Sequence, residues 1–519
     1  MAIISDFMAF SAQHISIVVL LLVIIHFTRN YLTPGVCAVP GPFLAKISNI
    51  WRFFDVANGS AEATLYKLHR KHRDYVRLGP NVVSVWSLDA LKIIYGINKG
   101  YTKTDFYKVQ QQLSKGKPAS TLFTATDERF HTDIKRPVSA AYSMSTLKEF
   151  EPFVDTTIHT LFKRLDEFVA QNQVCDIATW LQYCVKSLGF LEQGTDIDGI
   201  IAALEKILDY SGKVGQMPWL DYVFVKNPLR QFIQGGSTGA IARFARARLD
   251  ERLKQPKTTL HSPKNTHTRS RKDFLYRFLQ AKEQYPEVVN DHQVFSYTVA
   301  NMNAGSDTTA ISLRAILYYT LKNPRVKAKL HQELNTAYQS KRISLPVSWI
   351  QSQEQLPYMD AVIKEALRLH PAIGLILERI VPAEGLQLPN GGPFLPAGTI
   401  VGANPWVIHR HSVFGEGVDS FIPERWLQAD HESESQFQDR KQQMLRANYT
   451  FGAGPRTCIG KNISLLEIYK LIPSLLLKYQ IELENINKKW ETFNAWFVRQ
   501  KHMDVIIRHN SLDAEPGYA

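Results

Sequence analysis

Cysteine is scarce in this chain of 519 residues, which contains four cysteines, at positions 37, 175, 184 and 458. No two of them are spaced as a CxxC pair, so a structural zinc site built on such pairs is not expected. Four thiols in a chain of this length also argue against a disulfide scaffold. We therefore expect the main body of the protein to face a reducing compartment.

The sequence also lacks the spacing patterns of nucleic-acid-binding modules, although it is basic. Its formal net charge is +13, and basic residues cluster at KLHRKHR (67–73) and THTRSRK (266–272). No zinc-finger or helix-turn-helix spacing surrounds these clusters, so we expect no nucleic acid as a partner. A dispersed basic surface fits an anionic membrane or an acidic protein better.

One long uncharged run lies near the N-terminus, from Phe7 to Thr28. A bilayer-spanning helix needs about 20 apolar residues, so we predict a membrane anchor over residues 1–30, followed by a proline-rich hinge over 31–45. Two alternatives are a cleaved signal peptide, with VCA (36–38) as its cleavage site, and an interfacial or tilted helix. No basic residue precedes the run and Arg29 follows it, which favours an uncleaved anchor with its C-terminal side in the cytoplasm.

Residues 46–519 are predicted to form a single large domain that is mainly α with a smaller β portion. YVRLGPNVVSVWS (75–87) alternates around a Gly-Pro-Asn turn, which predicts a β-hairpin. Helical patterns dominate from about 127 to 335, strands and turns return over 380–410, and a last helix is expected at about 460–478. The polar segment 255–273 lacks periodicity and is predicted to be a solvated surface loop.

The segment KEALRLHP (364–371) places an acid and a base on one face of a predicted helix. Glu365 and Arg368 are three positions apart, which is the spacing of a surface ion pair of small energetic value. The apolar residues around them indicate instead a buried pair that needs further partners. Arg425 in PERW (423–426) is the candidate partner.

A second polar group interrupts a long helical pattern that is expected over about 291–322 and to end before Pro324. The sequence AGSDTT (304–309) is a poor helix core by propensity. One interpretation is a polar face turned to solvent. The other is a helix that is locally loosened against a ligand, with Asp307 and Thr308 positioned to relay protons.

The third motif is FGAGPRTCIG (451–460), a glycine-rich loop that contains Cys458. Cys458 could be a small buried thiol, or a thiolate whose pKa is lowered by Arg456 and by the helix expected to follow. Thr457 occupies the third glycine position of a GxGxxG pattern, so the loop does not have the dinucleotide-binding fingerprint. A metal thiolate with a single protein ligand indicates heme.

Together, AGSDTT, EALR (365–368), PERW and FGAGPRTCIG, in this order, resemble cytochrome P450. The last motif matches the family's heme-binding signature F-x-x-G-x-R-x-C-x-G at every fixed position. The resemblance covers essentially the whole chain and implies the cytochrome P450 fold and bound heme b. It implies that Cys458 is the thiolate ligand of the iron, that Phe451 packs against the same side of the heme, and that Arg456 and Arg379 pair with its propionates.

The resemblance also explains the pair on the KEALRLHP helix, because Glu365, Arg368 and Arg425 would form a buried structural triad. One departure concerns the helix that meets the propionates, where the family often carries Trp-x-x-x-Arg. This chain has His131 and Lys135 there. Both can donate to a carboxylate, but lysine lacks the bidentate fork of arginine.

The implied activity is that of a heme-thiolate monooxygenase which uses O2 and, through Asp307 and Thr308, a supply of protons. Electrons would come from a separate NADPH-cytochrome P450 reductase, with cytochrome b5 as a second possible donor, on the endoplasmic reticulum membrane. Alternatives are an isomerase or dehydratase on the same fold, which needs no reductase, and a non-catalytic heme-binding sensor.

The substrate is expected to be an apolar small molecule. By resemblance, the segments 105–126, 301–304 and 372–377 would line its pocket. The sequences LERIVPAEG (377–385) and FGAGPRTCIGKNISLLEI (451–468) resemble the pisatin-demethylase-like branch of fungal cytochromes P450. That branch implies specialised metabolism, with a terpenoid, polyketide or phenolic substrate.

Overall fold

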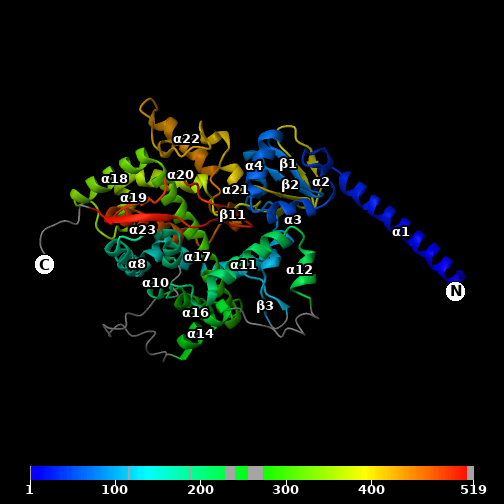
Figure 1. Ribbon diagram of the computed structural model, residues 1–519, viewed down its shortest axis with the longest axis horizontal. Helices are drawn as coiled ribbons and strands as arrows, with labels where there is room; N and C mark the ends of the chain where they lie inside the picture. Colours follow the sequence, from blue (N-terminus) through cyan, green and yellow to red (C-terminus); the bar gives the residue numbers. More distant parts are fainter. Residues whose placement is uncertain (1, 115–116, 186–188, 228–239, 255–272, 511–519) are drawn as a thin grey trace.

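The structure, a computed structural model, describes residues 2–114, 117–185, 189–227, 240–254 and 273–510. The loop predicted over 255–273 therefore lies outside the described residues except at position 273. The basic segment THTRSRK (266–272) lies entirely outside them. The body is mainly helical with a smaller β portion, as predicted (Figure 1). Its longer helices are α4 (Ala61–His72), α8 (Glu151–Gln171), α11 (Ile200–Val214), α14 (Ala240–Lys254), α16 (Phe274–Gln284), α17 (Asp291–Lys322), α18 (Pro324–Gln339), α20 (Pro357–Leu369), α22 (Glu434–Arg446) and α23 (Lys461–Lys478).

Helix α17 runs through the middle of the body and contacts helices from α9 to α23 (Figure 1). It begins where the side chain of Asn290 accepts a hydrogen bond from the backbone N–H of Gln293, and it ends at Asn323, because Pro324 cannot continue the hydrogen-bond pattern. Leu313, Ile316 and Leu317 on this helix are fully buried. The helix therefore forms the centre of the hydrophobic core.

The predicted hairpin is present as β1 (Tyr75–Gly79) and β2 (Val82–Val85). Strand β2 continues into a four-stranded sheet in the order β1-β2-β9-β6, with β9 (Ile400–Gly402) parallel to it and β6 (Arg379–Ile380) antiparallel to β9. A second sheet has the order β10-β13-β5, formed by β10 (Tyr479–Leu483), β13 (Asp504–His509) and β5 (Cys175–Asp176). Two-stranded pairs complete the β portion: β3 (Leu113–Ser114) with β4 (Lys117–Pro118), β7 (Leu386–Gln387) with β8 (Phe394–Leu395), and β11 (Thr492–Asn494) with β12 (Val498–Gln500).

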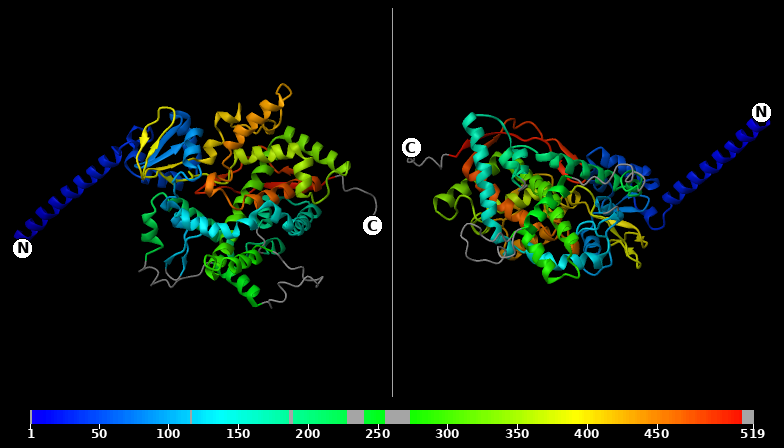
Figure 2. Two further views of the ribbon diagram at one scale, coloured as in Figure 1. Left: turned by 180° about the vertical axis from the view of Figure 1, so that it is seen from behind. Right: turned by 90° about the horizontal axis from the view of Figure 1, so that it is seen from below.

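Shorter helices connect and cover these layers. They are α2 (Phe43–Ile47), α3 (Ile50–Ala57), α5 (Leu88–Ile94), α6 (Glu128–Lys135), α7 (Met144–Leu147), α9 (Ile177–Cys184), α10 (Phe190–Gln193), α12 (Trp219–Phe224), α19 (Trp349–Gln355) and α21 (Pro405–Ile408). Helix α1 (Ala2–Tyr31) extends away from the body in every view (Figures 1 and 2). Its segment His14–Tyr31 has a mean hydropathy of 1.5 and no buried residue, so it is apolar and long enough to cross a membrane.

Candidate heme-thiolate site

Cys458 lies on a tight loop between α22 and α23. Gly452 and Gly454 adopt left-handed backbone conformations, with φ of 70° and 68°, and a Cβ atom on Gly454 would collide with the backbone oxygen of Tyr95. The backbone N–H of Cys458 donates to the carbonyl oxygen of Phe451 at 2.9 Å, which closes the loop. The result is an exposed Cys458 side chain held three residues before the first turn of α23.

The expected net lowering of the Cys458 pKa is wrong, although the backbone N–H groups at the start of the following helix do act in the expected direction. The pKa of this thiol is raised, because protein atoms crowd around it and weaken its hydration, although part of the residue reaches the surface. The backbone N–H groups of Gly460 and Lys461, and the charges of Lys135 and Lys461, oppose this effect without reversing it. Arg456 is engaged elsewhere, because its Nη2 lies 2.8 Å from Oε1 of Glu128.

Five basic side chains gather near Arg456, and we call them the basic cluster: Lys103, His131, Lys135, Arg379 and Arg456. The pKa of His131 is lowered to about 3, first by burial and then by the charges of the other four. The pKa of Lys103 is lowered well below its usual value, again first by burial and then by Arg379 and Arg456. Chain segments that are far apart in the sequence therefore hold like charges close together.

The protein itself only partly compensates the basic cluster. Lys103 donates to the carbonyl oxygen of Phe123 at 2.6 Å, Lys135 to that of Pro455 at 2.9 Å, and Arg379 to that of Glu378 at 2.8 Å. Arg456 is paired with Glu128, but its Nη1 is buried and has no hydrogen-bond partner among the described residues. A bound group with two carboxylates would supply the missing acceptors and negative charge, which is the chemistry of the heme propionates.

The resemblance to cytochrome P450 implies four members of the basic cluster as partners of the propionates but not Lys103. This lysine lies before η2 (Asp105–Gln110), in a buried stretch with no recognisable motif, and its ammonium group lies 4.2 Å from the ring centroids of both Tyr107 and Phe123. Glu128, on the first turn of α6, was also missed. A lysine between buried residues is a weak signal that its charge has a specific partner.

Glu365, Arg368 and Arg425 meet in the core. Arg368 binds both carboxylate oxygens of Glu365 at 2.8 Å, and Nε of Arg425 donates to Oε1 of Glu365 at 2.8 Å. Trp426 adds a bond from Nε1 to Oε2 at 2.9 Å. Burial alone would raise the pKa of Glu365, but the two arginines hold it below its usual value. The group joins α20 to the PERW segment that precedes the cysteine loop.

The polar residues of α17 point in different directions. Asp307 is buried, and its Oδ1 accepts a hydrogen bond from Nε2 of Gln182 at 3.0 Å. The hydroxyl of Thr309 bonds to that of Ser464 on α23 at 3.0 Å. Neither side chain lies on a solvated face. The expected loosening is also wrong, because α17 is a continuous α-helix in which the hydroxyl of Thr308 donates back to the carbonyl oxygen of Ala304 at 2.9 Å.

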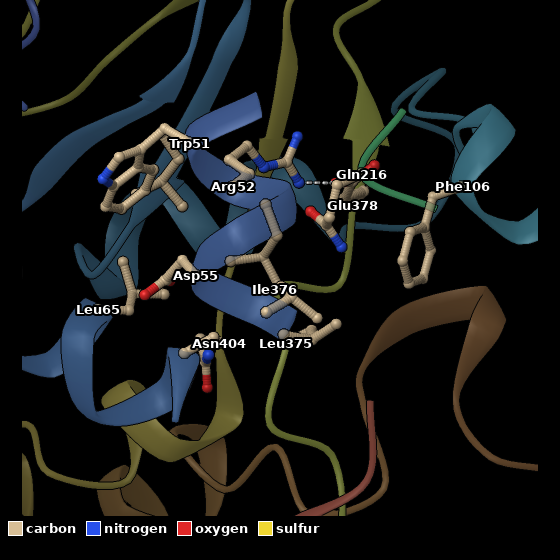
Figure 3. A pocket seen from close by; sticks show the side chains of 13 residues that line it. Trp51, Arg52, Asp55, Leu65, Phe106, Gln216, Leu375, Ile376, Glu378 and Asn404 are labelled. Atoms are coloured by element: carbon tan, nitrogen blue, oxygen red, sulfur yellow. Dashed lines mark hydrogen bonds and ion pairs between the residues drawn. The ribbon is translucent and has the colours of Figure 1, made fainter. Parts of the chain in front are cut away.

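Within the segment 372–377, which was expected to line a substrate pocket, the residues are divided between two environments. Gly374 packs tightly against Asn494, and the backbone of Ala372 accepts a hydrogen bond from Val498, so this part supports the β11–β12 hairpin. Leu375 and Ile376, together with Phe106, line a pocket of about 430 Å³, solvent-filled space included (Figure 3).

A charged pair crosses the wall of this pocket between α3 and the segment that leads into β6. Nη2 of Arg52 lies 2.5 Å from Oε1 of Glu378, as Figure 3 shows. The hydroxyl of Thr104 donates to the other oxygen of Glu378 at 2.6 Å. Because Glu378 precedes Arg379, the pocket wall and the basic cluster share one stretch of chain.

A single cysteine on a glycine-shaped loop, next to a basic cluster that fits two carboxylates, defines a heme-thiolate protein. The sequence pattern of the cytochrome P450 family matches residues 40–507, and the chain belongs to this family. It is similar to a cytochrome P450 monooxygenase of Aspergillus terreus, with 39% identity over 93% of this chain and 98% of the relative. The monooxygenases cicH of Emericella nidulans (40% identity; 91% and 93% covered) and vrtE of Penicillium aethiopicum (34%; 94% and 93%) are also similar.

The chain is therefore an oxidoreductase of the monooxygenase type, and heme, bound through a cysteine thiolate as in the rest of the family, is its cofactor. The raised pKa of the Cys458 thiol does not conflict with this cofactor. A metal cation deprotonates a coordinating thiol, so the negative charge need not be prepared by neighbouring side chains.

Proposed function

We propose that Cys458 is the iron ligand of a monooxygenase that oxidises an apolar small molecule with O2. The single observation that supports this best is the exposed Cys458 on its glycine-shaped loop beside the basic cluster. Heme supplies the oxygen chemistry when bound, and the thiolate favours cleavage of the O–O bond.

The residues around the heme would then have distinct roles. The basic cluster would hold the propionates, with Arg456 released from Glu128 or shared with it. Phe451 would cover the cysteine side of the heme; its ring is half-buried and lies 5.9 Å from Nζ of Lys461. Glu365, Arg368 and Arg425 would fix the segment that carries the loop without contacting the heme.

Asp307 and Thr308 would supply protons. Each monooxygenation consumes one substrate, one O2, two electrons and two protons, and yields the hydroxylated product and one water. An isomerase or dehydratase would not need this supply, so the acid and the hydroxyl on α17 favour oxygen activation. Thr308 would have to give up its bond to Ala304 to donate outward.

We infer that the protein lies on the cytoplasmic face of the endoplasmic reticulum membrane. Besides α1, the body exposes apolar side chains at two places, which we together call the apolar patch: Phe43, Leu44, Ile50 and Phe54 on α2 and α3, and Trp219, Tyr222, Val223, Phe224 and Val225 at α12. Figure 1 places α12 below α3, on the side from which α1 projects. Apolar residues gathered beside a membrane anchor fit the surface of a bilayer.

Electrons would come from NADPH-cytochrome P450 reductase, and cytochrome b5 is a second candidate donor. Lys461, at the start of α23, is exposed beside the cysteine loop and fits an acidic partner. Lys461→Glu should therefore slow reduction by the reductase, and the effect should shrink at high salt. Lys67→Glu, at an exposed position on α4, is the control. Unchanged reduction in Lys461→Glu would argue against this docking face.

For the substrate we propose a terpenoid, polyketide or phenolic compound of specialised metabolism. The similar monooxygenases come from filamentous fungi of the genera Aspergillus, Emericella and Penicillium. Leu375, Ile376 and Phe106 offer apolar contacts, and the pair of Arg52 with Glu378 adds polar groups, to a molecule in the pocket of Figure 3. Screening such compounds for a shift of the heme absorption band would test the class.

The first experiment is a carbon monoxide difference spectrum of the reduced full-length protein in membranes. We expect a strongly red-shifted Soret band in the wild type and in Cys37→Ser, which changes another exposed cysteine, and its loss in Cys458→Ser. A folded, heme-loaded wild type without this band would refute the assignment of Cys458 as the ligand.

A further inference from the structure

Asp307 is held by a neutral side chain from a different helix. Gln182 on α9 donates from Nε2 to Oδ1 of Asp307 at 3.0 Å, and its Oε1 accepts from Nη2 of Arg314 at 2.8 Å. All three side chains are buried, with exposed fractions of 8%, 2% and 7% for Gln182, Asp307 and Arg314. The two bonds fix the orientation of the amide, because the guanidinium can only donate.

Arg314 is itself held in place. Its Nε and Nη2 donate to the carbonyl oxygen of Ala178 at 2.9 and 2.7 Å, and its Nη1 donates to that of Gln500 at 3.4 Å. Arg314 follows Asp307 on α17 by about two helical turns, so both project from the same face of the helix. Gln182 bridges the gap between them.

An amide in this position has a different consequence from a cation. A bidentate arginine on Asp307 would stabilise the carboxylate strongly and keep it ionised. An amide donor instead orients the carboxylate through a weaker bond and places no charge in direct contact with it. The arrangement keeps the positive charge of Arg314 near Asp307 but one side chain away.

We propose that Gln182, oriented by Arg314, is a positioning residue that holds Asp307 for proton delivery. This inference rests on the proposed function of Asp307 and Thr308. It predicts that loss of the amide slows the step that needs protons and leaves heme binding intact.

The test compares Gln182→Met with Gln500→Met in the full-length protein, reconstituted with NADPH-cytochrome P450 reductase in phospholipid vesicles. Gln500 is the matched control, because its buried amide donates to the carbonyl oxygen of Ile311 on the same helix at 3.0 Å. Gln182→Glu is a second variant of nearly the same shape, which keeps an acceptor for Arg314 and removes the donor to Asp307.

Two rates are measured for each variant. The first is NADPH-driven consumption of O2, which requires protons from the protein. The second is oxidation of tetramethyl-p-phenylenediamine driven by cumene hydroperoxide, which brings oxygen already reduced to the peroxide level and already protonated. A general acid typically contributes a factor of about 10² to 10⁴, and a mispositioned one loses part of it, so we expect the first rate to fall about tenfold or more in both Gln182 variants.

The second rate should be unchanged in all variants, and the solvent deuterium isotope effect on the first rate should increase only in the Gln182 variants. Equal loss of both rates in the Gln182 variants, or O2 consumption equal to that of Gln500→Met, would overturn the inference. A wild type that shows the carbon monoxide band but consumes no O2 with NADPH would instead overturn the proposed function on which the inference rests.

Discussion

His409 accepts a hydrogen bond at Nε2 from the backbone N–H of Tyr449 at 2.8 Å. Its Nδ1 lies 2.9 Å from the carbonyl oxygen of Arg368, so Nδ1 carries the proton and donates there. The ring thus connects the helix of the Glu365 group to the start of the cysteine loop. A second proton on Nε2 would face the Tyr449 N–H, and burial together with Arg368 lowers the pKa of His409 to about 3.

Acid should therefore destabilise the protein through its buried histidines. The pKa values of His69 and His370 are each lowered to about 4, mainly by burial, and that of His409 to about 3, from 6.5. As the pH falls from 6.5 toward 4, these histidines bind protons in the unfolded chain but remain neutral in the folded protein. The protons therefore stabilise the unfolded chain, and the free energy of unfolding decreases over this range. Each histidine contributes a slope of up to about 1.4 kcal/mol per pH unit.

Thermal unfolding between pH 7 and pH 4 measures this slope. His409→Gln should lower the melting temperature at pH 7 and make its dependence on pH shallower. His292→Gln, at an exposed position on α17, should change neither. A pH dependence in His409→Gln as steep as in the wild type would contradict the assignment.

Glu365→Gln should be strongly destabilising. The substitution leaves Arg368 and Arg425 buried without their shared carboxylate, and such a loss costs about 3–5 kcal/mol of unfolding free energy. Glu482→Gln removes an exposed carboxylate 3.2 Å from Arg508 and should cost about 0–1 kcal/mol. Chemical unfolding in detergent, followed by tryptophan fluorescence, compares the two. Similar losses in both variants would show that the Glu365 group has no special structural role.

Motifs in the sequence predicted much of the fold but less of the site. The C-terminal end of α17 followed from Pro324, and the hairpin at 75–87 from its Gly-Pro-Asn turn, because both signals are local. The meeting of Glu365 with Arg425 could be predicted because apolar neighbours show that the pair is buried. Glu128 could not be found in this way, because it meets Arg456 across 328 positions in the sequence.

The same limit explains the error about Cys458. The sequence predicts that Arg456, two positions away, lowers the pKa of the thiol. In the structure the guanidinium of Arg456 is directed toward Glu128, and burial has the largest effect on the pKa of Cys458. Gln182 and Lys103 were also missed, because glutamine and lysine occur mostly as solvated residues and acquire a role only from partners in the folded chain.

Lys103→Met should weaken heme retention. If the basic cluster holds the propionates, loss of Lys103 removes a charge-assisted hydrogen bond of about 1.5–3 kcal/mol. This free energy corresponds to roughly ten- to a hundredfold faster transfer of heme to apomyoglobin. Lys99→Met changes an exposed lysine on the same segment and should leave the rate unchanged. Equal transfer rates for the two variants would remove Lys103 from the site.

The apolar patch should bind membranes even without the anchor. A protein lacking residues 1–30 should still sediment with phospholipid vesicles, because Phe43 and Trp219 are 66% and 59% exposed and an aromatic side chain gains about 1.5–3 kcal/mol on leaving water. The double substitution Phe43→Ser and Trp219→Ser should therefore abolish most of this binding. Phe153→Ser, which changes an aromatic residue 48% exposed on α8, is the control. If the truncated protein, its double variant and its Phe153→Ser variant all bind equally, another surface contacts the bilayer. If Phe153→Ser weakens binding as much as the double substitution, exposed aromatic residues promote binding regardless of their position.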